Sequence, residues 1–387
     1  MQQVFVCGGN VITSLGFSTE EHIDKIKLGI SGIRLIQDNS LYPEDFYASL
    51  VDNQRLENEC AALSCPSQFT RFEKLMILSA QNALAKNQHI DPASEKTVFV
   101  ISSTKGNINL LEENQKAAYE PERIFLWKSA KIIASYFGNN NKPLIISNAC
   151  ISGVLAITAA SQLLRSGLYE NAVVIGGDIA SEFVISGFIS FKSLANGICK
   201  PFDKNRNGLN LGEGAGTLIL STKPITHHNR PLIKILGGAS NNDANHISGP
   251  SRTGEGLFLA VSRALKSAGI KPAQIDFISA HGTATPFNDE MESKAFSSAG
   301  LSMAPLNSLK AYFGHTLGAA GIIESCISIY GLTHDIMFKT LGFNELGVPE
   351  PITVLDKLRP KVQKNILKTA SGFGGCNAAV VFAKDKE

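Results

Sequence analysis

Short apolar runs alternate with amphipathic stretches along most of the chain, and this alternation restricts its fold more than any other feature. Several runs are apolar almost throughout, as strands buried on both faces of a sheet are. The pattern predicts an α/β fold with mostly parallel sheets. The expected strands are 3–7, 97–102, 143–147, 171–176, 215–220, 232–240, 276–280 and 378–383, and the expected helices are 19–28, 71–86, 154–166, 256–268, 289–298 and 318–333.

Two parts of the chain are weakly alike. Residues 98–104 resemble 277–283, and 143–153 resemble 305–318, where a Pro-Leu strand start leads through a turn into a helix of small residues. An internal duplication explains the likeness, and chance similarity between short βα units is the alternative. A polar stretch with two prolines, 223–231, lies between the two parts. The predicted domains are 1–226 and 231–387.

Charge and composition argue against several classes of protein. Lys and Arg number 36 against 34 Asp and Glu, and this near-balance does not suit a dedicated nucleic-acid binder. No apolar run approaches the roughly 18 residues of a membrane helix, and residues 1–8 do not resemble a signal peptide. The seven cysteines are odd in number and match no zinc spacing. We therefore expect a soluble cytoplasmic protein with reduced thiols, without a metal, nucleic acid or membrane partner.

Cys150 stands in a segment that reads SNACISG, between an apolar run and the expected helix 154–166. The dipole and free amides of a helix amino end favour the thiolate form of such a cysteine. Ala149 and Gly153 leave room for a sharp turn. A buried structural thiol is the alternative interpretation.

Two histidines lie on turns. His281 follows an expected strand, at the end where α/β sheets collect their ligand sites, and Thr283 and Thr285 add hydroxyls beside it. His315 precedes a helix whose small residues suggest close packing against another helix. Taken alone, each histidine is also compatible with a structural role.

A glycine-rich loop, 372–375, precedes the last expected strand and can bring backbone amides close to a ligand. It lacks the Walker lysine and the spacing of a dinucleotide fingerprint, which argues against nucleotide binding. A cysteine with one histidine and an Asn or Asp would suit a protease-like site. Two histidines instead suit carbanion chemistry on a thioester, which needs donors that polarise a second carbonyl.

These motifs, in this order, resemble those of the elongating β-ketoacyl-acyl carrier protein synthases over essentially the whole chain. The family consists of condensing enzymes with the thiolase fold, and the resemblance implies two duplicated halves packed as α-β-α-β-α layers. It also implies a β-ketoacyl synthase, an acyltransferase that condenses an acyl-cysteine with malonyl-acyl carrier protein and needs no cofactor beyond the carrier's phosphopantetheine. The motifs are 8–16, 29–33, 149–150, 201–203, 212–216, His246, 281–286, 310–315 and 372–375.

The resemblance implies a role for each matching residue of the reaction centre. Cys150 corresponds to the nucleophile that accepts the acyl chain. His281 and His315 correspond to the pair that binds the malonyl thioester carbonyl and promotes decarboxylation. Lys310 corresponds to the active-site lysine that supports His281, and Glu292 to the acidic residue that contacts this lysine.

Three further residues correspond to the substrate channel. Thr283 and Thr285 match the pair that holds the phosphopantetheine arm. Phe373 matches the aromatic gate, and its amide together with that of Cys150 would form the oxyanion hole. The resemblance also implies a dimer, either of identical chains or with a ketosynthase-like chain.

Some positions depart from the family's pattern. Residues 102–107 read SSTKGN where the family has Gly-x-Gly-Ile-Gly-Gly, so Lys105 replaces an apolar wall residue of the acyl pocket near the dimer interface. The segment 111–141 is also short. Both departures favour polyketide or aryl polyene assembly over plain fatty acid synthesis.

Some relatives hold a structural cation, partly through an Asn before the Ala-His-Gly motif and an Asn-Ser pair before the gate. The corresponding residues here are Ser279, Thr369 and Ala370. Glu324 is the one expected ligand that persists, so we expect no such ion.

Three alternatives stay open. The first is a housekeeping fatty acid elongation synthase. The second is a thiolase, in which Cys376 would be the second cysteine. The third is a non-catalytic chain-length partner of a ketosynthase heterodimer, although such partners usually lack the nucleophile that Cys150 represents.

Overall fold

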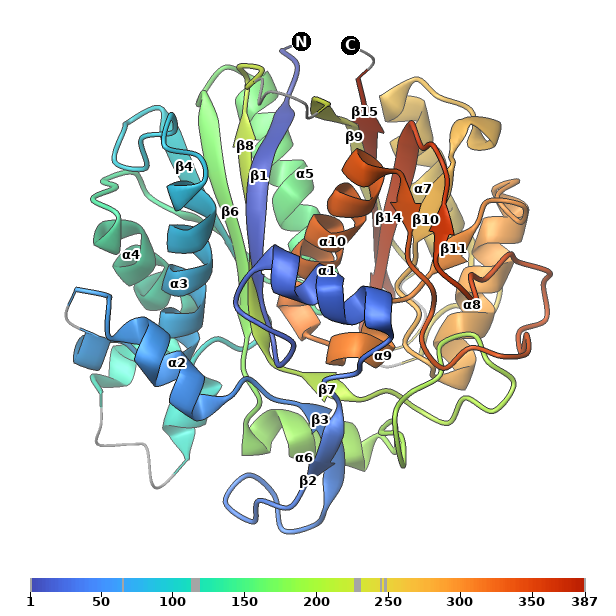
Figure 1. Cartoon of the computed structure of the whole chain (residues 1–387), viewed down its shortest axis with the longest axis horizontal. Helices are drawn as coiled ribbons and strands as arrows, with labels where there is room; N and C mark the ends of the chain where they lie inside the picture. The colour runs from blue at the N-terminus through green and yellow to red at the C-terminus, as the bar shows by residue number, and fades with distance from the viewer. Residues whose placement is uncertain are drawn as a thin grey trace.

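The computed structural model describes residues 2–64, 66–112, 119–225, 231–243, 246 and 249–385. Within these residues a ten-stranded mixed sheet forms the centre of the molecule (Figure 1). Its strands are β1 (Phe5–Ile12), β4 (Thr97–Ser102), β5 (Leu144–Ile146), β6 (Asn171–Asp178), β8 (Gly214–Ser221), β9 (Ile233–Asn242), β10 (Phe277–Ser279), β11 (Leu306–Asn307), β14 (Asn365–Gly372) and β15 (Cys376–Lys384).

The described part of the chain also contains ten α-helices, five short 3-10 helices and two small sheets. The α-helices are α1 (Thr19–Leu28), α2 (Asn53–Cys60), α3 (Arg71–Ala85), α4 (Leu126–Tyr136), α5 (Ser152–Arg165), α6 (Glu182–Ser190), α7 (Glu255–Ala268), α8 (Pro286–Ser298), α9 (Lys310–Phe313) and α10 (Ala320–His334). The small sheets contain β2 (Arg34–Ile36), β3 (Phe46–Ser49) and β7 (Leu211–Gly212), and β12 (Ile336–Met337) and β13 (Arg359–Pro360).

The large sheet consists of two half-sheets with the same pattern. One runs β5-β4-β6-β8-β1 and the other β11-β10-β14-β15-β9. In each half-sheet the first three strands are parallel to one another, and the fourth strand pairs antiparallel with both the third and the fifth. The halves meet where β1 pairs with β9, at Phe5↔Lys234 and Val6↔Ile233. This repeated order confirms the predicted duplication.

The expectation of mostly parallel sheets is wrong, because antiparallel pairs outnumber parallel ones among the ten strands. Helices cover both faces of each half-sheet, so a strand such as β8 is buried on both faces whatever its direction. A nearly continuous apolar run therefore reports burial rather than strand sense.

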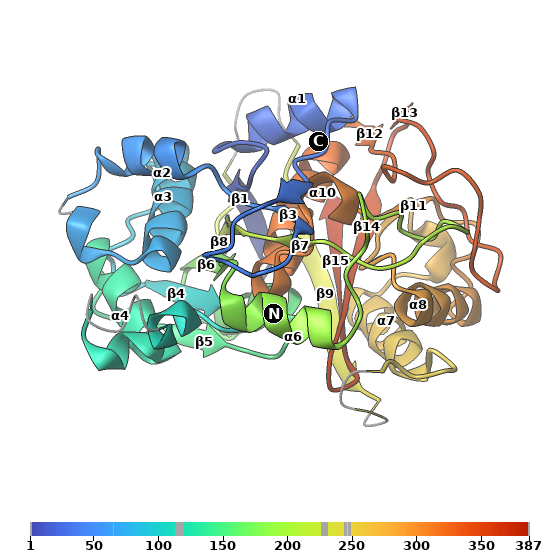
Figure 2. The same cartoon turned by 90° about the horizontal axis from the view of Figure 1, so that it is seen from below.

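The layers follow the predicted α-β-α-β-α order. Helices α5 and α10 lie between the half-sheets, α3 packs on the outer face of one and α7 on the outer face of the other (Figure 1). Figure 1 shows α6 and the small sheet β2-β3-β7 at the lower end of the molecule, and in Figure 2, seen from below, α6, β3 and β7 lie in front of its centre. Buried aliphatic side chains of α5 and α10, including Ile157 and Ile327, form the central core.

Most predicted elements occur within a few residues of their expected bounds. The longer elements β14, α2, α4 and α6 were missed, and so were the short ones, β2, β3, β7, β11, β12, β13 and α9. β14 reads NILKTASG, with Lys368 and several polar residues among few apolar ones, and α6 is too uniformly apolar to show a helical period. The predicted domain boundary, 223–231, includes 226–230, which lie outside the described residues, and it stays a prediction. In the part of the chain that the structure describes, none of the helices combines the length and apolar character that a membrane crossing requires.

Candidate active site

Cys150 lies on a tight turn between β5 and α5. Ala149 adopts a positive φ of 44°, a conformation that costs free energy for a residue with a Cβ and is typical of functional turns. The Ser152 hydroxyl closes the turn, because it accepts from the Asn148 amide at 2.7 Å and donates to the Ala149 carbonyl at 2.7 Å. The turn therefore fixes Cys150 two residues before Ser152, the first residue of α5.

The two central helices cross closely enough to bring Cys150 to His315. A Cβ on Gly321 of α10 would lie 2.5 Å from the Val154 nitrogen, and one on Gly153 of α5 would lie 2.9 Å from the Ile322 nitrogen. Glycine is therefore required on both sides of the crossing. The contact confirms the close packing that the small residues of 318–333 predicted.

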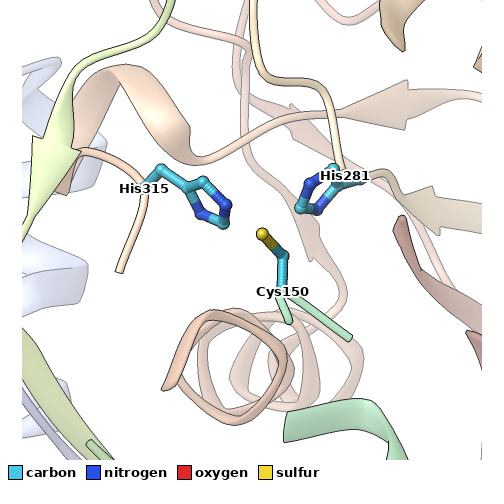
Figure 3. A group of neighbouring side chains, drawn as sticks. All are labelled: Cys150, His281 and His315. Atoms are coloured by element: carbon cyan, nitrogen blue, oxygen red, sulfur yellow. The ribbon is translucent and has the colours of Figure 1, made fainter. Parts of the chain in front are cut away.

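Cys150, His281 and His315 converge although they come from three separate segments. The Cys150 sulfur and a ring nitrogen of each histidine all lie within 4.8 Å of one another. The two imidazole centroids are 5.1 Å apart and the rings are nearly perpendicular. Figure 3 shows the thiol directed toward the space between the rings. All three side chains are buried.

Both histidines are neutral at physiological pH. Burial lowers the pKa of His281 and of His315 well below the ordinary value, and the nearby charges of Lys310 and Lys368 lower both further. Within the described residues, neither ring nitrogen of His315 nor Nδ1 of His281 has a hydrogen-bond partner. These nitrogens are therefore available to a substrate.

Burial raises the pKa of the Cys150 thiol to about 12, although the Lys310 charge and a hydrogen bond from the Phe373 backbone lower it. The prediction of a favoured thiolate is therefore wrong for the resting protein, because desolvation outweighs these stabilising contributions. The cysteine is a thiol at neutral pH and needs a base when it reacts.

Lys310 contacts the backbone of His281. Its buried ammonium donates to the His281 carbonyl at 3.1 Å and forms an ion pair with Glu324 of α10. The predicted contact between Lys310 and Glu292 is wrong, since Glu324 is the carboxylate that Lys310 contacts. The two carboxylates could not be told apart from the sequence, because the choice depends on how α8 and α10 pack.

Glu292 instead holds the backbone of the histidine turn. Its carboxylate accepts from the amides of His281 at 2.8 Å and Gly282 at 2.6 Å. Helix α8 begins directly after this turn and carries Glu292 back toward it. Burial and the neighbouring Asp289 raise the pKa of Glu292 to about 7.

Thr283 and Thr285 line a cavity of about 510 Å³ that reaches the reaction centre, which we call the histidine-side cavity. Their hydroxyls lie 2.9 Å apart, and the residue between them, Ala284, has a positive φ of 61°. His246 also lines this cavity. Both threonines therefore line the same cavity as Cys150.

Phe373 lies between this cavity and a second one. Its ring stacks on Phe188 at a centroid distance of 5.7 Å and meets Phe191 edge-on at 5.3 Å. All three rings line both cavities. Because Cys150 also lines both, the nucleophile stands at their junction behind an aromatic cluster.

Lys105 borders the second cavity, of about 1050 Å³, which we call the Lys105-side cavity. The lysine is exposed, and its ammonium lies 5.7 Å from the ring centre of Phe183. In the single chain it therefore stands at the edge of the cavity and is not buried in an apolar tunnel, where it would carry a desolvation cost.

Asp178 is a residue of the site that the sequence analysis missed. Its buried carboxylate accepts from the Ser103 hydroxyl at 2.8 Å and from the Thr104 amide at 3.0 Å on the turn that carries Lys105. It also accepts from the Gly318 amide at 2.7 Å, next to the His315 turn. An acidic residue at the end of the apolar run 171–176 was the available signal.

Other motif residues act on the backbone or on each other. Asp203 accepts from the amides of Asn344 at 2.8 Å and Glu345 at 3.0 Å, and Glu213 pairs with Arg71. The Cys376 thiol contacts the Phe373 carbonyl at 3.2 Å. These three residues therefore have structural partners.

Comparisons with known proteins agree with this fold. Residues 1–224 match the family described as "Beta-ketoacyl synthase, N-terminal domain", and residues 232–344 match "Beta-ketoacyl synthase, C-terminal domain". A putative mitochondrial 3-oxoacyl-[acyl-carrier-protein] synthase of Schizosaccharomyces pombe is 27% identical, with 99% of each chain covered.

Two solved structures share the fold. A ketosynthase in complex with its chain length factor from Xenorhabdus doucetiae has a TM-score of 0.86 and 24% identity, with 99% of this chain and 98% of that chain covered. The second is a chain from the structure of a type II polyketide synthase acyl-carrier protein in complex with its ketosynthase. It has a TM-score of 0.81 and 20% identity, with 99% of this chain and 100% of that chain covered.

A thiolase-like fold of two duplicated halves, with a cysteine and two histidines at its centre, defines a condensing-enzyme class. The chain belongs to the β-ketoacyl synthase family.

Proposed function

We propose that the chain is an acyltransferase that joins an acyl group on Cys150 to a malonyl unit delivered by acyl carrier protein, with loss of carbon dioxide. The observation that carries this proposal is the position of the Cys150 thiol, which lies at the junction of two cavities and between two neutral histidines. One cavity suits the carrier arm and the other suits the acyl chain.

The first half-reaction transfers the acyl group. The Cys150 sulfur attacks the thioester carbonyl as its proton passes to a base, and the carrier thiol leaves with a proton. The amides of Cys150 and Phe373 stabilise the oxyanion, a contribution of about 3–4 kcal/mol per donor in comparable sites. Either neutral ring, His281 or His315, is within reach as the base, so acylation retains a base when one of the two histidines is lost or displaced.

The second half-reaction makes the carbon–carbon bond. The malonyl thioester carbonyl accepts hydrogen bonds from His281 and His315, carbon dioxide leaves, and the resulting enolate attacks the acyl carbon. The Cys150 sulfur departs with the bonding electrons and regains a proton. Decarboxylation supplies the carbanion, so we propose that the reaction uses neither a metal ion nor a cofactor beyond the carrier's phosphopantetheine.

The proposal is tested with carrier protein loaded with an acyl group and with malonate. We expect release of carbon dioxide and formation of a 3-oxoacyl thioester in a ping-pong pattern. Carbon dioxide release without a condensed product would favour the non-catalytic chain-length partner. Cys150 itself argues against that alternative.

We further propose that the protein acts as a dimer, of identical chains or with a ketosynthase-like chain. Exposed apolar side chains, including Leu111, Phe183 and Phe191, border the Lys105-side cavity, and such a surface suits a partner subunit. Light scattering at micromolar concentration should give a mass near twice 41.5 kDa, alone or with that chain. A stable, active monomer under these conditions would rule the dimer out.

We propose that the pathway is polyketide or aryl polyene assembly rather than housekeeping fatty acid synthesis. Lys105 is the residue through which this proposal can be tested. Lys105→Ile should raise the relative rate for long saturated acyl thioesters by about tenfold, because an apolar side chain at the edge of the cavity favours an alkyl chain. Rates for an acyl series measure this change. Lys131→Ile, an exposed lysine of α4, is the control. Identical profiles for Lys105→Ile and the wild type would return housekeeping elongation to first place.

A further inference from the structure

Lys368 has no role in the reaction as derived above, yet it lies fully buried beneath the site. It stands on β14 directly beside Ser279 of β10, in register. Four oxygens surround its nitrogen: the carbonyls of Ser279 at 3.2 Å, Ala280 at 3.3 Å and Thr369 at 2.6 Å, and a carboxylate oxygen of Glu324 at 2.7 Å.

The oxygen shell indicates that Lys368 carries a positive charge. All four neighbours are hydrogen-bond acceptors, and a neutral amine would direct its lone pair at one of them. Burial and the neighbouring Lys310 charge lower the pKa of Lys368 on balance, and the Glu324 carboxylate, which favours the charged form, opposes this shift. An ammonium surrounded by carbonyls and one carboxylate resembles the oxygen shell that proteins build around a monovalent metal ion.

The residues at this place do not fit the structural cation that some relatives hold. The carbonyls of Ser279 and Thr369 and the Glu324 carboxylate already contact the Lys368 ammonium. A metal ion among these oxygens would stand against a like charge. The lysine therefore takes the place of the ion.

The same ammonium is coupled to the backbone of His281. Lys368 contacts the carbonyl of Ala280, the residue before His281, and Lys310 contacts the carbonyl of His281 itself. Glu324 pairs with both lysines and links the two contacts. Two ammonium groups thus hold consecutive carbonyls at the base of one catalytic side chain.

We propose that Lys368 is a positioning residue, an internal cation that fixes the backbone at His281 and makes the site independent of added monovalent metal ions. This inference rests on the function proposed above. The inference assigns Lys368 to the second half-reaction, because His281 acts on the malonyl thioester. Acylation of Cys150 does not depend on Lys368.

The test compares the wild type with Lys368→Ala and Lys368→Met in choline chloride, and then with LiCl, NaCl, KCl or RbCl at equal ionic strength. Malonyl thioester decarboxylation and the melting temperature are measured. In choline the decarboxylation rate of both variants should fall by about tenfold or more, the usual scale for removing a supporting partner. Acylation of Cys150 should stay within about twofold of the wild type, because its site is intact.

Ion identity separates a positioning role from mere structural support. Lys368→Ala leaves space lined by oxygens, so a larger ion such as K⁺ should bind and raise both its rate and its melting temperature in a saturable way. Lys368→Met fills the space without a charge and should respond to none of the ions. The wild type should be indifferent to them. Lys364→Ala, an exposed lysine just before β14, is the matched control and should behave as the wild type.

Three results would overturn the inference: a wild type that requires K⁺, a Lys368→Met variant with full activity, or a Lys368→Ala variant whose rate and melting temperature are the same in every salt. A wild type that does not decarboxylate the malonyl thioester contradicts the proposed function instead. The melting temperature needs no substrate, so the ion response of Lys368→Ala is read independently.

Discussion

Cys150→Ala should abolish condensation, with a loss of about three orders of magnitude or more, while decarboxylation of the malonyl thioester persists. The acyl group has no attachment site in this variant, whereas His281 and His315 still contact the second substrate. Product formation and carbon dioxide release are measured in parallel on the same carrier substrates.

Cys7→Ala is the matched control, since Cys7 lies on β1, outside both cavities. It should retain both activities. Condensation by Cys150→Ala, or inactivation of the wild type by iodoacetamide with Cys150 left unmodified, would show that another group is the nucleophile.

His281→Ala and His315→Ala should each lower the rate of condensation by about two orders of magnitude or more, the usual scale for losing an oxyanion-type donor. Acylation of Cys150 should survive better than condensation, because the amides of Cys150 and Phe373 serve that step. Single-turnover acylation and steady-state condensation separate the two steps.

His334→Ala is the control for these variants. This histidine is exposed at the end of α10, stacked on Tyr330, and should leave both steps unchanged. The division of roles fails if a variant of either catalytic histidine acylates poorly yet condenses at the normal rate once acylated.

Local patterns in the sequence marked Cys150, His281 and His315 as candidates, and the resemblance to the family assigned their roles. Cys150 and His281 each follow a recognisable apolar strand on a turn of small residues, and His315 precedes a helix whose small residues are legible in the sequence. Duplication was visible for the same reason, since each half repeats a short βα unit. These features depend on neighbouring residues and not on tertiary packing.

Features that depend on packing between distant segments could not be predicted in the same way. Lys310 pairs with Glu324 rather than Glu292 because α10 lies between the half-sheets and presents Glu324 to the turn. Lys368 made its segment look unlike a buried strand, because a charged residue is not expected there. In the structure its charge is balanced by groups on β10, β14 and α10, which the sequence does not reveal. The direction of the strands could not be predicted either, because burial by helices makes parallel and antiparallel strands equally apolar.

The mass of the Cys150 peptide after incubation with an acyl-loaded carrier protein tests the central claim most directly. The account predicts a peptide heavier by one acyl group at Cys150, which disappears when malonyl-carrier protein is added and a 3-oxoacyl thioester forms. An acyl group on a different residue, or product formation while the Cys150 peptide never carries the acyl group, would contradict it.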